Sequence, residues 1–348
     1  MDGLSEEMVS VSIGTAGVLG LAQVRLDALP TTAYLMVGGR CAMACAFCAQ
    51  ARDSRASALL LSRVSWPPFP QGEMVRRLRQ AAAEGTLRRV CIQATAGQGY
   101  YPRTLALVRA LRTEVPLPVD VAIIPRDMDQ VRDLLEAGAD HIGFGLDAAT
   151  PDLFRRVKGR AWEPVARTLE EAARTFPGRI AAHCIVGLGE TEREMVLALQ
   201  WLHNLGVTVG LFAFTPVPGT RMEHRPPPPL PSYRRVQVAH ALLARGLARA
   251  EAFTFDAGGR LTSFGDLDLP ACFPEGACFR TSGCPDCNRP YYNERPGTVP
   301  YNYPRPLTPA ETEEAWAALW ADLRGGCCQR ILNTECTDSS RPAGPQSV

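Results

Sequence analysis

The chain has 348 residues, of which 46% are hydrophobic and 21% are charged, so it can bury a sizeable core and is not a disordered protein. Its 37 Lys and Arg balance 36 Asp and Glu, which argues against a protein that coats nucleic acid or a membrane surface. Apolar runs stay shorter than the roughly 18 residues of a membrane span. The first 14 residues carry three acidic and no basic side chains, unlike a secretory signal, so we expect a cytoplasmic protein with reduced cysteines.

Apolar runs alternate with amphipathic segments from residue 31 to about 216, which predicts repeated strand–helix units. The apolar runs lack a period of two, as expected for strands of a parallel sheet covered on both faces. Strands are predicted at 31–38, 88–94, 119–124, 141–147, 179–187 and 207–216, and helices at 72–85, 101–115, 127–140, 151–159, 163–176 and 190–206. Units of this length predict an α/β fold with a full or partial (β/α) TIM-like barrel, and a doubly wound open sheet is the alternative.

A polyproline stretch at 225–231 predicts a domain boundary. A helix over 232–249, a hairpin over 253–265 and a helix over 308–325 with Thr308 as its cap are predicted beyond it. The segment between this hairpin and the helix that follows it is rich in Cys, Pro, Gly and Tyr and has no periodicity, so something besides a hydrophobic core must order it. The predicted parts are a lead-in at 1–30, a core at 31–224, an extension with a Cys-rich segment at 232–306, and a terminal helix with a loose tail at 307–348.

The first group of cysteines directly follows the first predicted barrel strand, at the carboxyl end where barrel enzymes carry their chemistry. It consists of Cys41, Cys45 and Cys48. A [4Fe–4S] cluster held by three thiolates keeps one iron open to a ligand that is not protein. A zinc or structural cluster completed by a distant residue is the alternative.

A second group lies in the irregular segment of the extension and consists of Cys272, Cys278, Cys284 and Cys287. These four thiols can ligate one ion, and both zinc and a second Fe–S cluster remain open. Either metal would order the segment around it. Cys91 and Cys184 are expected to be buried strand residues, and no specific role is assigned to Cys327, Cys328 and Cys336 in the tail.

The segment CAMACAFC, with Phe47 before its third cysteine, resembles the signature of the radical S-adenosylmethionine (SAM) superfamily. The resemblance implies a [4Fe–4S] cluster on the first cysteine group and SAM on its open iron, with Phe47 among the residues that contact SAM. It also implies reductive cleavage of SAM to a 5′-deoxyadenosyl radical, which abstracts a hydrogen atom.

Three further segments are similar to SAM-binding motifs of this superfamily. GLDAAT implies that Asp147 contacts the ribose, and IVGLGET implies that Ile185 and Gly187 lie against the adenine. His183 stands where the second pattern often begins with Gly. Gln93 stands at the end of the second strand, where Gly-Gly-Glu usually holds the amino group of SAM.

The run CFRTSGCPDCNRPYYNERPG, followed by YNYPRPLT, looks like one component of the two-protein lipoyl synthases. The resemblance implies a sulfurtransferase of the biotin/lipoyl synthase type that acts on a protein-bound octanoyl chain, with the second cysteine group as its auxiliary cluster. It implies as partners a lipoyl carrier protein, a second radical SAM subunit and an electron donor such as ferredoxin or flavodoxin, with no nucleic acid or membrane. The alternatives are a methylthio- or methyltransferase with a zinc module, and a non-catalytic Fe–S carrier.

Overall fold

The computed structural model describes residues 7–293 and 297–323. Its main sheet has eight strands in the order β10-β9-β8-β7-β6-β2-β1-β5. Six neighbouring strands are parallel: β2 (Thr32–Val37), β6 (Arg89–Ala94), β7 (Val119–Ile123), β8 (His141–Asp147), β9 (Ile180–Val186) and β10 (Thr208–Ala213). Because these strands follow one another in chain order, no switch point of a doubly wound sheet occurs. The predicted α/β fold with a full or partial (β/α) barrel is confirmed, although hydrogen bonds between the described strands do not close the barrel.

Helices cover the sheet because each buries apolar side chains against it, and three of them begin at a residue whose side chain caps the first turn. The side chains of Asp127, Thr150 and Thr191 accept hydrogen bonds from the first turns of three of them. The helices between the strands are α2 (Gln71–Ala83), α3 (Tyr100–Glu114), α4 (Met128–Glu136), α5 (Pro151–Lys158), α6 (Glu163–Thr175) and α7 (Glu192–Asn204). All six residues of β2 are buried, as expected for a strand with both faces covered.

The first 30 residues contribute directly to this sheet. β1 (Met8–Val11) pairs antiparallel with β2 and with β5 (Pro68–Pro70), and α1 (Ile13–Val18) follows it. A small hairpin of β3 (Leu60–Leu61) and β4 (Val64–Ser65) precedes β5. The lead-in therefore shares the hydrophobic core of the barrel.

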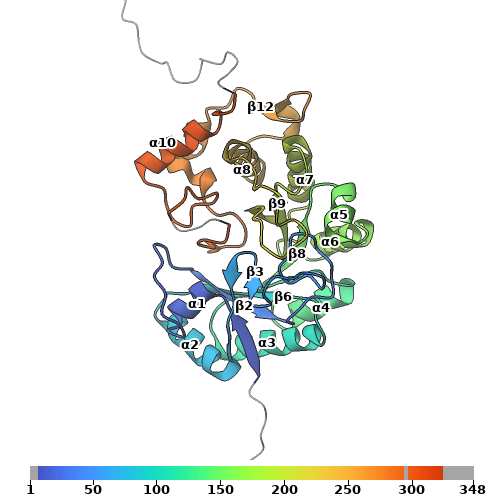
Figure 1. Ribbon diagram of the computed structural model, residues 1–348, viewed down its shortest axis with the longest axis vertical. Coiled ribbons are helices and arrows are strands. Elements are labelled where there is room, and N and C mark those ends of the chain that lie inside the picture. Colours follow the sequence, from blue (N-terminus) through green and yellow to red (C-terminus); the bar gives the residue numbers. More distant parts are fainter. Residues whose placement is uncertain (1–6, 294–296, 324–348) are drawn as a thin grey trace, which may run out of the picture.

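The extension forms a helical layer at the other end of the molecule from α1–α4 (Figure 1). Its elements are α8 (Leu230–Ala244), η1 (Ala250–Ala252), β11 (Thr254–Phe255), β12 (Leu261–Ser263), α9 (Leu269–Cys272), η2 (Pro274–Phe279) and α10 (Pro309–Ala318). The predicted hairpin is present, and Thr308 forms a capping box with Glu311. In the part of the chain that the structure describes, no helix is both long and apolar enough to cross a membrane.

The Cys-rich segment crosses the side of the barrel that the strands leave open. At one edge, the Leu211 amide of β10 donates to Ser282 Oγ (3.0 Å). At the other edge, the Thr31 amide beside β2 donates to Asn288 Oδ1 (3.0 Å). The segment, orange in Figure 1, therefore bridges the first and last parallel strands and brings its cysteines to the barrel. Cys327, Cys328 and Cys336 lie outside the described residues.

Candidate active site

The loop that carries Cys41, Cys45 and Cys48 begins where β2 ends and folds back on itself. The Cys41 amide donates to the Gln50 carbonyl (2.8 Å), which closes the loop across the cysteine group. The Arg40 guanidinium donates to the carbonyls of Ala49 (2.8 Å) and Ala56 (2.9 Å). These hydrogen bonds all go to backbone carbonyls, so they hold the loop around the three cysteines without requiring particular side chains at the accepting positions.

A close backbone contact holds this loop against the next βα unit. A Cβ atom at Gly97 would lie 1.9 Å from the carbonyl oxygen of Gly38, so no larger residue fits there without moving the chain. Ala42 also donates its amide to the carbonyl of Ala96 (2.9 Å). The position of the cysteine loop therefore depends on glycine at position 97.

The three cysteines line one cleft and are half-buried. Burial raises the pKa of Cys45, and burial followed by the charge of Cys45 raises the pKa of Cys48 to about 12. Free thiols at Cys45 and Cys48 hold their protons, so a metal centre is what would make them thiolates. The donor set therefore fits a cluster with three cysteine ligands and one open position.

The cleft is a hollow of about 1200 Å³, counting its open mouth, at the carboxyl ends of the strands. Of the residues predicted to contact SAM, Phe47, Gln93, Asp147 and Ile185 line it together with the three cysteines. Gly187 does not line this cleft. It faces a separate hollow beside Pro228, and its carbonyl accepts a hydrogen bond from Arg225 Nε (2.7 Å).

Lys158 is a residue of this site that sequence reasoning missed. Its ammonium group donates to the Asp147 carboxylate and the Gly145 carbonyl from the last turn of α5. Burial opposes the charge of Lys158, but Asp147 and then Cys45 raise its pKa above the usual value. A signal was available, because Lys158 lies one turn after the buried Phe154 on the apolar stripe of the helix.

A profile of the Radical SAM superfamily matches residues 35–202. The biotin synthase of Desulforudis audaxviator is 31% identical over 239 residues, which cover 66% of this chain and 68% of that protein. The chain belongs to the radical SAM superfamily. A lipoyl synthase of Salmonella newport is 24% identical over 190 residues, which cover 51% of this chain and 55% of that protein. Among solved structures, methylornithine synthase has a TM-score of 0.48 at 14% identity and covers 67% of this chain and 65% of its own.

Membership of the radical SAM superfamily confirms the predicted kind of enzyme and implies a [4Fe–4S] cluster and SAM as its cofactors. The cleft offers three cysteine sulfur atoms for the cluster, and it is lined by Phe47, Asp147 and Ile185, which are predicted to contact SAM.

Four side chains separate this cleft from a second cavity deeper in the barrel of the radical SAM fold. Gln93, His183, Phe212 and Tyr292 line both spaces, and we call them the dividing wall. Burial lowers the pKa of His183 to about 4, so the imidazole is neutral at physiological pH. Its ring packs edge-on against Phe212, which in turn packs against Tyr292. Gln93, which lines both spaces, donates to the sulfur of Cys91 (3.1 Å) on the side of the second cavity.

The second cavity brings together Cys91, Cys284 and Cys287, which we call the second cysteine site. Burial raises the pKa of Cys284, and the charges of Asp120 and then Cys91 and Cys287 add to this effect. The Tyr34 hydroxyl lies 3.5 Å from the sulfur of Cys287. Three thiols from distant parts of the sequence therefore meet inside the barrel.

The structure does not bring Cys272 and Cys278 to this site. Cys272 ends α9, and its carbonyl accepts a hydrogen bond from Arg245 (3.2 Å). Cys278 is buried in η2, where burial raises its pKa to about 12 and its charged neighbours are Arg234 and Arg245. Neither Cys272 nor Cys278 lines the cavity that Cys284 and Cys287 line, so the four predicted ligands do not share one site. The sequence could not predict this separation, because all four cysteines lie in one irregular segment without a periodic pattern.

Sequence reasoning also placed Cys91 among the buried strand residues without a role. Its side chain is on the inward face of β6, two residues before Gln93, and both line the second cavity. The alternation of strand side chains was the available signal, because it puts residues two apart on the same face.

Proposed function

We propose that this radical SAM enzyme inserts sulfur at unactivated carbon atoms of a protein-bound octanoyl chain. One observation carries the proposal: two sites of three cysteines each lie on either side of a single dividing wall. A sulfur-inserting enzyme needs a radical generator and a sulfur source within reach of the same carbon atom. The biotin and lipoyl synthases among the relatives add support for this reaction class.

In the proposal, Cys41, Cys45 and Cys48 hold the catalytic cluster. When bound, this cluster supplies the electron that cleaves SAM to a 5′-deoxyadenosyl radical. Asp147 is proposed to accept hydrogen bonds from the ribose, and Lys158 orients it from the opposite side. Phe47 and Ile185, which line the cleft, are proposed contacts of the nucleoside, whereas Gly187 faces the separate hollow beside Pro228.

The second cysteine site is proposed to hold the auxiliary Fe–S cluster. Soft thiolate ligands favour such clusters, and three of them converge here. Arg289 lies half-buried beside them, 3.6 Å from the sulfur of Cys287, with its guanidinium 4.0 Å from the centre of the Phe212 ring. Its positive charge would offset the negative charge of a cluster ligated by thiolates.

The dividing wall supports an alkyl substrate. Phe212 and Tyr292 are aromatic, and His183 is uncharged, so the wall offers no fixed charge that an octanoyl chain would have to desolvate. A chain that enters from the SAM cleft and displaces these rings would carry one carbon between the two cysteine sites.

We propose three partners for this reaction. The octanoyl chain would arrive on a lipoyl carrier protein, a second radical SAM subunit would share the two sulfur insertions, and ferredoxin or flavodoxin would supply electrons. The similarity of the Cys-rich segment to one component of two-protein lipoyl synthases supports the first two.

The metal content of anaerobically reconstituted protein tests the auxiliary cluster. About eight iron atoms per chain are expected for two [4Fe–4S] clusters. Cys284→Ala should lose about half of the iron, whereas Cys278→Ala, a buried cysteine of the same segment, should retain it. One zinc per chain in place of half the iron would contradict the sulfur-donor role and favour a methylthio- or methyltransferase with a zinc module.

An octanoylated carrier peptide tests the reaction itself. Mass spectrometry should show a gain of sulfur with the wild type and none with Cys284→Ala, while both still form 5′-deoxyadenosine from SAM. Turnover of SAM by the wild type without any gain of sulfur would reject the proposed function.

A further inference from the structure

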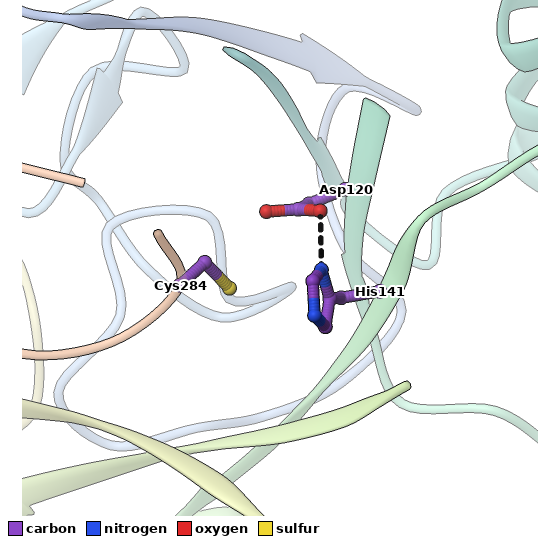
Figure 2. A group of neighbouring side chains, drawn as sticks. All are labelled: Asp120, His141 and Cys284. Atoms are coloured by element: carbon purple, nitrogen blue, oxygen red, sulfur yellow. Dashed lines mark hydrogen bonds and ion pairs between the residues drawn. The ribbon is translucent and has the colours of Figure 1, made fainter. Parts of the chain in front are cut away.

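An acidic side chain lies at the edge of the second cysteine site. Asp120 of β7, His141 of β8 and Cys284 offer ligand atoms that all lie within 4.8 Å of one another. Figure 2 shows one carboxylate oxygen of Asp120 bonded to His141 and the other on the side of Cys284. The two oxygens of this carboxylate therefore have different surroundings.

One oxygen of Asp120 is fully engaged. Oδ1 accepts a hydrogen bond from Arg89 Nη1 (2.7 Å) and lies 3.1 Å from His141 Nδ1. The Asp120 side chain is only 4% exposed, and among the described residues its buried Oδ2 has no nitrogen or oxygen donor; on that side only the weak thiol donor of Cys284 interacts with Asp120. A buried carboxylate oxygen that faces only a thiol is poorly satisfied, so its retention points to a ligand.

A single metal ion among the three residues of Figure 2 does not explain this oxygen well. Arg89 Nη1 lies 2.7 Å from both Asp120 Oδ1 and Asp140 Oδ2, and 3.5 Å from His141 Nδ1. The Arg89 guanidinium thus already supplies a positive charge beside Asp120 Oδ1 and His141, and it would repel a cation bound to His141. What remains available is Asp120 Oδ2, which faces the thiols.

We propose that Asp120 is an oxygen ligand of the auxiliary cluster, in addition to Cys91, Cys284 and Cys287. This inference rests on the proposed function, because it requires a cluster at the second cysteine site. Three thiolates leave one iron of a [4Fe–4S] cluster without a protein ligand, and Asp120 is the carboxylate beside them. Arg89 and His141 act as positioning residues, since they hold Oδ1 and leave Oδ2 directed to the cluster.

An oxygen ligand has a chemical consequence for this cluster. Carboxylate is a harder ligand than thiolate and matches iron in the cluster less well. The iron bound by Asp120 is therefore the one held least firmly, which suits a cluster that gives up sulfur.

The test uses full-length protein in which Cys41, Cys45 and Cys48 are replaced by alanine, so that only the auxiliary cluster remains. After reconstitution with ⁵⁷Fe, Mössbauer spectroscopy should resolve a minority iron of about one quarter of the total, with the larger isomer shift of an oxygen-ligated site. Asp120→Cys should move this iron into the thiolate population, and Asp120→Asn should change its parameters while keeping an oxygen for Arg89.

Asp140→Asn is the matched control, because Asp140 shares the contacts to Arg89 and His141 but is not part of the group with Cys284. Its spectrum should equal that of the parent. If iron is bound but the spectra of Asp120→Asn and Asp120→Cys equal the parent spectrum, ligation by Asp120 is overturned and the auxiliary cluster stands. If the parent binds no iron, the auxiliary cluster itself is wrong, and the inference falls with it.

Discussion

Replacing Lys158 by methionine tests the electrostatics of the SAM cleft. The Lys158 side chain is 2% exposed and the Asp147 side chain 12%, so the substitution leaves a buried carboxylate facing an apolar side chain. Removing one partner of a buried ion pair lowers stability by roughly 3–5 kcal/mol. Asp147→Asn should also destabilise, because it leaves a buried ammonium group that keeps only the Gly145 carbonyl.

The double variant Lys158→Met/Asp147→Asn removes both charges and should recover much of the lost stability. The measurement is urea unfolding of the metal-free, reduced protein, because bound clusters would break two-state behaviour. The loss in Lys158→Met corresponds to a fall of roughly 6–20 °C in the melting temperature, taking about 2–4 °C per kcal/mol. Strictly additive single effects would show that the two side chains do not interact, and would refute this description of the cleft.

Three further predictions address the loop and the buried histidines. Arg40→Ala removes hydrogen bonds to the backbone of the cysteine loop, so it should lower the iron bound at the catalytic cluster and leave the auxiliary iron unchanged. Iron content is measured with Arg40→Ala introduced into the wild type and into Cys284→Ala, which retains only the catalytic cluster. Gly97→Ala should do the same more severely, and unchanged iron content would contradict the close contact with Gly38. Burial lowers the pKa of His203 and His240 to about 4, below the value of about 6.5 for an unfolded chain. The unfolded state therefore binds more protons, so stability should be full above pH 6.5 and should fall toward pH 4. Replacing both histidines by glutamine should reduce this fall and leave the share of His183, whose pKa burial also lowers to about 4, and an unchanged slope would contradict the prediction.

Local sequence patterns predicted the strands, the helices and the first cysteine site well. Cys41, Cys45 and Cys48 follow one strand within eight residues, so their proximity needs no tertiary information. Asp147 and Ile185 were predicted from the resemblance of their segments to SAM-binding motifs, and both lie at the carboxyl ends of their strands.

The second cysteine site could not be found in this way because its contacts are distant in sequence. Tyr34 and Cys287 are 253 residues apart, and they meet only because the Cys-rich segment crosses from β10 to β2. The same crossing leaves Cys272 and Cys278 behind in α9 and η2. Spacing along the chain suggested one group of four, whereas the fold selects two of them and adds Cys91 from a strand.

The open iron at the first cysteine site is the central claim, and electron paramagnetic resonance of the reduced Cys284→Ala variant tests it most directly. This variant retains only the catalytic cluster, so its signal is not obscured by the auxiliary one. Addition of SAM should shift the g-values of the reduced cluster and yield 5′-deoxyadenosine, and Cys45→Ala introduced into this variant should abolish both. A spectrum that SAM leaves unchanged, without 5′-deoxyadenosine, would contradict the account.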